Sequence, residues 1–243
     1  MILSHKIHVL TKKEELDTVR LAGNVAVVLD VLFATSTMVT ALAHGATAVV
    51  PALDETGARG VAAGLAPGSF VVAGEFYAET IEGFAPPTPL ALVEYGIAGR
   101  KLVYTTTNGT VAMNACAGAA DVYCGALLNG SALVERLVTA HRDQAVVLVC
   151  AGSMNNFNLE DFYGAGYLVD LLVRRLGEGA DFSDAARAAR ALYLHCDPAA
   201  SLLGCRVGKL MAERGLESEV RFAAQRSILD VVPRLRDGRL LPV

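Results

Sequence analysis

The stretch Val25–Thr37, VAVVLDVLFATST, decides the fold of this chain. Its first half is an apolar, β-branched run, which is typical of a buried strand in a parallel sheet. Asp30 ends this run, and the hydroxyl residues Thr35, Ser36 and Thr37 follow where a helix can begin. Because ligands in open α/β sheets gather at the carboxyl ends of strands, we expect Asp30 to lie at a functional site. The alternative is that Asp30 only caps the following helix.

The composition is that of a folded protein without a basic surface. The chain has 243 residues, of which 53% are hydrophobic and 19% charged, and its net charge is -4. Such a chain can bury a sizeable core, and its negative charge gives no field for holding a nucleic-acid backbone. The five cysteines form no CxxC pair and match no zinc spacing. We therefore expect no nucleic-acid partner.

The sequence also contains no segment that we expect to enter a membrane. The N-terminal residues MILSHKIHVL hold no long apolar stretch after their basic residues, so the cytoplasm is the expected location. Residues 31–53 lack Asp, Glu, Lys and Arg. Their hydroxyl cluster, the break at His44-Gly45 and the presence of Pro51 favour a helix followed by a strand over a membrane span.

Apolar runs and helical patterns alternate along most of the chain. We expect strands at residues 7–10, 25–30, 46–50, 69–73, 101–104, 122–124 and 145–149. This rhythm predicts an α/β fold with a largely parallel central sheet, followed by a helical flank up to about residue 214. Asp237-Gly238 predicts a C-terminal hairpin. No stretch reads as a linker, so residues 1–243 should form one unit; the alternative is two closely packed lobes, roughly 1–98 and 99–243.

Four acidic residues follow three different predicted strands. They are Asp30, Glu75, Glu160 and Asp161. Carboxylates from separate strand ends suit Mg²⁺, which takes oxygen ligands and keeps waters that a phosphate ester can share. We therefore take these four as candidate metal ligands and catalytic acids. The alternative for Glu160 and Asp161 is that they form the acidic first turn of a helix and complement its dipole.

The turn TTTNGT at residues 105–110 has a different use. Its successive backbone N–H groups open onto a helix start and are flanked by hydroxyl groups, which favours a cradle for an anion. Thr106, Thr107, Asn108 and Gly109 are therefore candidate substrate-binding residues. The alternative is an ordinary strand-to-helix turn in which Thr and Asn supply the cap.

The segments DVLFATST, GE, TTTNGT and AGSMNNFNLEDFYGAG stand in an order that resembles the ComB family, the 2-phosphosulfolactate phosphatases of coenzyme M biosynthesis. The resemblance implies a three-layer α/β/α fold, dependence on Mg²⁺ and hydrolysis of a phosphate monoester of a small sulfonated acid. It implies a metal-holding acidic set of Asp30, Glu75, Glu160 and Asp161. It also implies substrate-binding positions at Thr35, Ser36, Thr107, Asn108 and Gly109.

The chain departs from the family's pattern on the side that would hold anions. Phe33 and Phe76 stand where the family usually has arginine, and residues 83–89, GFAPPTP, lack the acid and amide of the family's GFDxGNSP pattern. Losing a charge-assisted arginine contact typically costs ~1.5 to 3 kcal/mol. We hypothesise that the site still binds a cation but accepts a less anionic or more apolar substrate.

The leading interpretation is a cytoplasmic Mg²⁺-dependent phosphatase that acts on a small anionic phosphorylated substrate. One alternative is a haloacid-dehalogenase-like phosphatase with Asp30 as nucleophile, although Leu32 stands where that class has a second aspartate. Another is a non-catalytic protein that binds small molecules on the ComB fold. For so apolar a chain we also expect a homodimer.

Overall fold

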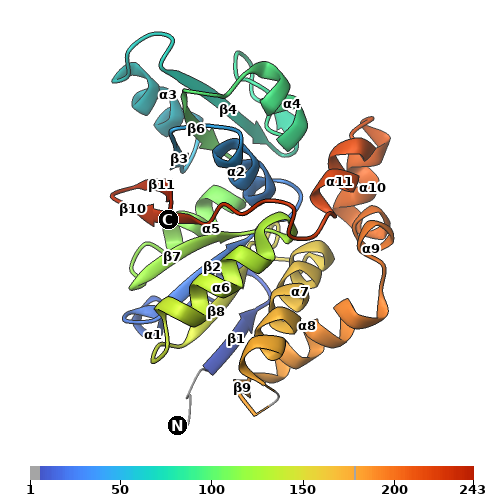
Figure 1. Cartoon of the computed structure of the whole chain (residues 1–243). Helices are drawn as coiled ribbons and strands as arrows, with labels where there is room; N and C mark the ends of the chain where they lie inside the picture. The colour runs from blue at the N-terminus through green and yellow to red at the C-terminus, as the bar shows by residue number, and fades with distance from the viewer. Residues whose placement is uncertain (1–5, 178) are drawn as a thin grey trace.

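The structure is a computed structural model, and it describes residues 6–177 and 179–243. The strands of these residues form a mostly parallel sheet of 11 strands with helices on its faces (Figure 1). The strands are β1 Lys6–Leu10, β2 Val25–Leu29, β3 Ala48–Ala52, β4 Phe70–Phe76, β5 Glu79–Thr80, β6 Lys101–Thr105, β7 Asp121–Gly125, β8 Val146–Cys150, β9 Asp181–Phe182, β10 Pro233–Arg236 and β11 Arg239–Pro242. The predicted α/β fold is confirmed.

The helices agree with the predicted alternation. They are α1 Thr18–Leu21, α2 Ala34–Ala43, α3 Glu55–Ala63, α4 Pro89–Tyr95, α5 Gly109–Ala115, α6 Gly130–Ala140, α7 Leu159–Leu176, α8 Asp184–His195, α9 Pro198–Gly204, α10 Arg206–Glu213 and α11 Glu217–Ala223, with 3-10 turns η1 Lys13–Glu15 and η2 Leu127–Asn129. The turn η1 and helix α1 are separate, because the Asp17 side chain accepts hydrogen bonds from Val19 and Arg20 N–H and starts a new helix there. Residues 74–89 contain the end of β4 and the short β5.

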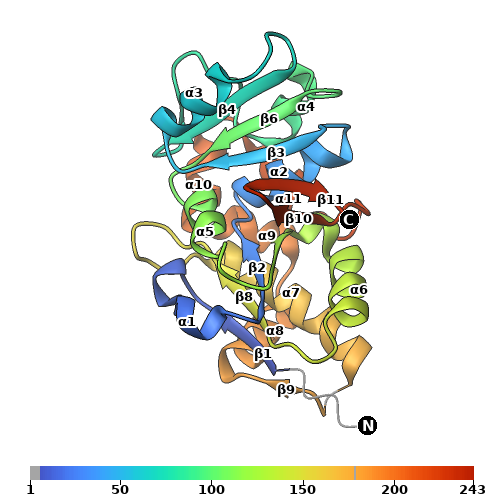
Figure 2. The ribbon, with the colours of Figure 1, turned by 90° about the vertical axis from the view of Figure 1, so that its left-hand side faces the viewer.

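The C-terminal hairpin forms as predicted, but it lies in the middle of the sheet. The strand order is β5-β4-β6-β3-β11-β10-β7-β2-β8-β1-β9. β11 is antiparallel to β3, with Leu240 opposite Val49, and β10 is antiparallel to β7 (Figure 2). Asp237 and Gly238 both have positive φ, as a two-residue hairpin turn requires. The hairpin therefore joins two groups of parallel strands into one sheet. A division into lobes at residue 98 would separate β6 from β3 and β4, which flank it.

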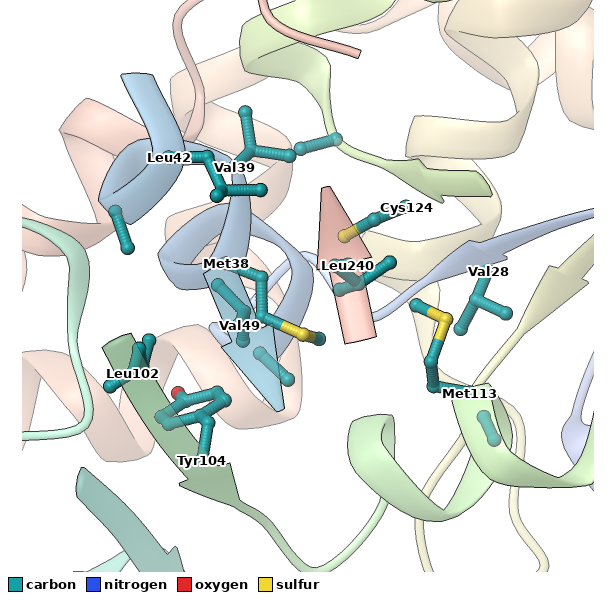
Figure 3. Close-up of a cluster of buried hydrophobic side chains, with 14 of the residues drawn as sticks. Val28, Met38, Val39, Leu42, Val49, Leu102, Tyr104, Met113, Cys124 and Leu240 are labelled. Atoms are coloured by element: carbon teal, nitrogen blue, oxygen red, sulfur yellow. The ribbon is translucent and has the colours of Figure 1, made fainter. Parts of the chain in front are cut away.

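The main core lies between the sheet and helices α2 and α5. β2 is buried on both faces: Ala26 and Val28 belong to this core, whereas the alternate side chains of the strand pack under α6 and α7. Figure 3 shows Leu240 of the hairpin surrounded by side chains from both groups of strands, among them Val28 of β2 and Val49 of β3. The continuous apolar run at 25–29 is explained by this burial on two sides.

Helices α9, α10 and α11 form a separate layer beside the sheet (Figure 1). Their apolar side chains pack with Leu32, Phe33 and Tyr163 in a cluster of their own. Glu219 of α11 accepts hydrogen bonds from Thr88 Oγ1 and from Leu90 and Ala91 N–H at the start of α4. A buried carboxylate at a helix N-terminus is favourably placed. Glu219 thus connects the layer formed by α9, α10 and α11 to helix α4.

We expect the hairpin to be essential for stability. Replacing Leu240, which is fully buried, with Ala should lower the free energy of unfolding by about 2 to 5 kcal/mol, because it leaves a cavity where the two groups of strands meet. Leu241→Ala is the matched control, since the neighbouring leucine is only half-buried and should cost about 1 kcal/mol or less. Urea unfolding of the two variants measures both values, and equal losses would contradict a central role for the hairpin.

Candidate active site

A cavity of about 350 Å³ opens where the carboxyl ends of β2, β4, β6 and β8 face helix α10. The structure brings the segments that follow these four strands to this pocket. Asp30 follows β2, Glu75 lies near the end of β4, Thr107 follows β6, and Ser153 follows β8, and all four residues line the cavity. The position agrees with the general rule for open parallel sheets, in which ligands bind beyond the strand ends.

Asp30 is the carboxylate at the base of the pocket. Its Oδ1 accepts a long hydrogen bond of 3.4 Å from Ala34 N–H at the start of α2. A Cβ atom at Gly109 would lie 2.6 Å from Asp30 Oδ2, so only glycine lets α5 start this close to the carboxylate. Burial raises the pKa of Asp30 to about 7, and the nearby charges of Glu75 and Glu160 add to the shift. Asp30 can therefore take up and release a proton near neutral pH.

Glu75 faces the same pocket but is firmly held. Its Oε1 accepts a hydrogen bond of 2.6 Å from Thr107 N–H, and its Oε2 accepts bonds from Ala78 N–H and the Thr107 hydroxyl. Thr107 Oγ1 in turn accepts a bond from Tyr77 N–H. These contacts join the loop after β4 to the loop after β6. Glu75 thus fixes the shape of the pocket wall, and its Oε1, which accepts one hydrogen bond, retains a lone pair for a further partner.

The turn at 105–110 is partly closed by its own hydrogen bonds. Thr106 N–H donates to Thr110 Oγ1, and Thr110 N–H donates to Thr106 Oγ1. In the part of the chain that the structure describes, no acceptor pairs with the N–H groups of Asn108 and Gly109 at the start of α5. Of the predicted cradle, these two N–H groups are the donors left for an anion.

Thr35 and Ser36 are fully buried and do not line the pocket. The Thr35 hydroxyl donates to the carbonyl of Asp30 and accepts a bond from its N–H, and the Ser36 hydroxyl donates to the carbonyl of Val31. Both side chains lie within α2 and hold the turn that presents Asp30. In this geometry they support the site from behind, in place of the substrate contacts expected from the sequence.

Asp161 is also completely buried, with 0% of its surface exposed. Its Oδ1 accepts a hydrogen bond of 2.9 Å from Val31 N–H, and its Oδ2 accepts one of 3.1 Å from Gly152 N–H. One carboxylate thus connects the segments that follow β2 and β8. Burial raises its pKa well above the ordinary value, and Asp30 and Glu160 add to the rise. The structure therefore places Asp161 behind the pocket, as a residue that fixes two of its loops.

Glu160 lies beside Asp161 in the first turn of α7, where the alternative interpretation put both acids. It is 2% exposed, and burial raises its pKa, whereas a hydrogen bond with Cys205 and the charge of Arg206 oppose the rise. Cys205 caps the start of α10. Of the four predicted acids, the structure thus brings Asp30 and Glu75 to the pocket surface and keeps Glu160 and Asp161 beneath it.

Arg206 is the pocket residue that the sequence did not reveal. It stands first in α10, lines the cavity and donates hydrogen bonds to Ser153 Oγ and Asn158 Oδ1. It comes from a stretch that we expected only to pack on the sheet, and nothing in its sequence context distinguishes it from other surface arginines. Phe33 also lines the pocket, whereas Phe76 is 62% exposed and does not. Of the two phenylalanines that stand where the family usually has arginine, only Phe33 therefore lies at the pocket.

The donor set suits Mg²⁺ better than a metal that needs a full protein cage. Within residues 6–177 and 179–243, no three His, Cys, Asp or Glu side chains come together as a metal-binding group. Mg²⁺ is commonly held by one or two carboxylates, with waters and substrate phosphate completing its shell. Asp30 and Glu75 could supply these oxygens. The charge of Glu75 raises the pKa of Asp30, and a cation between the two would relieve that repulsion.

Comparison with known proteins gives a consistent picture. A family model described as 2-phosphosulpholactate phosphatase matches residues 10–238. A protein of Symbiobacterium thermophilum named probable 2-phosphosulfolactate phosphatase is 37% identical over 91% of this chain and 95% of its own length. A protein of Clostridium acetobutylicum with the same name is 30% identical over 97% of this chain and 100% of its own length. In the described residues no helix is both long and apolar enough to span a membrane.

We expect Asp161→Asn to destabilise the protein. The carboxamide can accept from only one of the two N–H groups of Val31 and Gly152, and its own NH₂ group faces the other. The free energy of unfolding should fall by about 1 to 3 kcal/mol in urea titrations, and the two amides should exchange hydrogen faster. Asp143→Asn, at an exposed position, serves as control. An unchanged stability in both variants would show that the two contacts contribute little.

Asp30 should make stability depend on pH. Its carboxyl group has a pKa of about 7 in the fold and an ordinary value of 3.8, so the folded state binds more protons between these values. This contribution therefore falls as pH rises from about 4 to 7. Asp30→Asn should remove that loss and stabilise the protein at pH 8 relative to pH 4, by on the order of 2 to 4 kcal/mol. Urea unfolding without divalent cations measures the difference, and a pH-independent effect would contradict it.

Proposed function

Because the chain belongs to the 2-phosphosulpholactate phosphatase family and is a phosphoric monoester hydrolase, we propose that the pocket described above hydrolyses a small phosphate monoester with the help of Mg²⁺. The relatives' names make 2-phosphosulfolactate the first substrate to assay. The homodimer and the cytoplasmic location stay predictions.

One observation carries the assignment of the chemistry to this pocket. Asp30, with a pKa raised to about 7, lines the same cavity as Asn108, whose N–H group lacks an acceptor among the described residues. A group that exchanges protons near neutral pH and a donor for a developing negative charge are the two things that hydrolysis of a phosphate ester requires.

The reaction uses these groups in a simple order. A water oxygen bonds to phosphorus, and the bond between phosphorus and the ester oxygen breaks. The proton that the water loses passes to Asp30, and solvent supplies the proton that the departing alkoxide oxygen takes up. The N–H groups of Asn108 and Gly109 stabilise charge on the phosphoryl oxygens. The products are inorganic phosphate and the alcohol.

Glu75 is the residue that would hold Mg²⁺, through the lone pair that its Oε1 retains, while Asp30 serves as the proton acceptor. When bound, the ion supplies positive charge that polarises the phosphoryl group and neutralises its oxygens. Glu75 also keeps Thr107 in place through the hydrogen bonds to its N–H and hydroxyl groups. Asp161 keeps the loops after β2 and β8 in register with each other. The buried acids thus act on the reaction only through the geometry of the pocket.

The direct test is release of inorganic phosphate from 2-phosphosulfolactate and from a panel of other small phosphate monoesters. We expect turnover that requires Mg²⁺ and that falls about 10²- to 10⁴-fold in Asp30→Asn, because the proton acceptor is lost. Asp143→Asn, at an exposed position, should retain full activity.

Two results would count against this proposal. Turnover that survives in Asp30→Asn would place the chemistry elsewhere. A phosphoryl group trapped covalently on Asp30 during turnover would instead favour the haloacid-dehalogenase-like mechanism, in which this residue is the nucleophile.

A further inference from the structure

The pocket has two walls of different chemistry. Asp30, Thr107 and Asn108 line it at the strand ends, whereas Phe33 and the apolar side chains of α10 line it as parts of one apolar cluster. We propose, on the basis of the phosphatase function above, that the preferred substrate is a 2-phosphooxy carboxylate with an apolar side chain. Its phosphate binds at the strand ends, its carboxylate binds Arg206, and its side chain packs against the apolar wall.

The apolar wall is a fixed part of the structure. Phe33 and Met211 are buried members of one apolar cluster, and Val207 and Leu210 pack against it. The cluster extends through the helical layer, so these side chains are held from behind. Burying an apolar group the size of a leucine side chain strengthens binding by roughly tenfold to a hundredfold. A substrate with such a group gains this contact, and a smaller substrate does not.

A sulfonate placed against the same wall would find no donor there. Of the residues that line the pocket, Arg206 is the only lysine or arginine. Phe33, Leu210 and Met211 have no polar side-chain atoms able to donate a hydrogen bond. An anion moved from water into such surroundings loses its hydration without compensation. The wall therefore selects against a second strong acid in this position.

Arg206 is well placed to bind one carboxylate. Among the described residues it forms no ion pair, and its hydrogen bonds go to the neutral oxygens of Ser153 and Asn158. These contacts orient the guanidinium group and leave it outside any ion pair among the described residues, although its charge acts on the nearby buried Glu160. A guanidinium group offers paired N–H donors that match a carboxylate. With the phosphate served at the strand ends, each of the two anionic groups of the substrate has a partner.

Three esters with a common core test the proposal. 2-Phosphosulfolactate, 2-phospholactate and 2-phosphooxy-4-methylpentanoate share the phosphate and carboxylate, and they differ only in a sulfonate, a hydrogen or an isopropyl group on the same carbon. We expect kcat/KM for the methylpentanoate ester to exceed that for 2-phosphosulfolactate at least tenfold, with 2-phospholactate between them. A preference for 2-phosphosulfolactate would overturn the proposed specificity.

Binding separates this inference from the phosphatase function. If none of the three esters releases phosphate, the proposed function fails, but titration calorimetry with the same compounds and Mg²⁺ still measures their Kd values. Tighter binding of the methylpentanoate ester would support the apolar wall as a recognition surface. Equal or reversed affinities would overturn it, whether or not the esters are hydrolysed.

A charge introduced into the wall should reverse the preference. Phe33→Arg should raise the kcat/KM or affinity ratio of 2-phosphosulfolactate to the methylpentanoate ester at least tenfold. Phe76→Arg is the matched control, because it adds the same charge at an exposed position outside the pocket lining. Should Phe33→Arg fail to fold, the half-buried Leu210→Arg on α10 tests the same wall. Similar ratios in the wall variant and the control would refute the proposed role.

Discussion

Three carboxylates, Asp30, Glu160 and Asp161, lie close together beneath and beside the pocket, and the site depends on how the fold accommodates them. Burial raises the pKa of each, and neighbouring charges add to the rise for Asp30 and Asp161. Two backbone N–H groups bind Asp161. Asp30 has a single long contact of this kind and remains open to the cavity. The same burial and repulsion that cost stability thus give Asp30 its affinity for a proton near neutral pH.

Chemistry and recognition come from different parts of the chain. In the proposed reaction the strand ends supply the groups that act on phosphate, whereas α10 supplies Arg206 and most of the apolar wall. The helical layer is attached to the sheet by separate contacts, among them the carboxylate of Glu219 at the start of α4. Changes in α10 can therefore alter which ester is accepted without disturbing Asp30. This arrangement explains how one fold can keep a reaction while its substrate changes.

The sequence predicted what depends on local interactions. The apolar run of β2 and the hairpin turn at Asp237-Gly238 follow from neighbouring residues, and the structure contains both as predicted. Features that depend on distant parts of the chain were not predictable in this way. Asp30 directly follows β2 and Asp161 lies in the first turn of α7, and only the fold exposes the first to the cavity and buries the second. Arg206 reaches the pocket because α10 packs over it, which no local pattern records.

The place of the C-terminal hairpin has a consequence for the order of events during synthesis. β10 and β11 follow all other strands in the chain, yet they occupy the middle of the sheet, between β3 and β7. Until these strands leave the ribosome, the facing edges of β3 and β7 have no partner. Unpaired edges of this kind are prone to associate with other chains. We therefore expect the edges of β3 and β7 in newly made protein to need protection from association with other chains. This need should last longer than in a protein whose sheet is completed by strands adjacent in sequence.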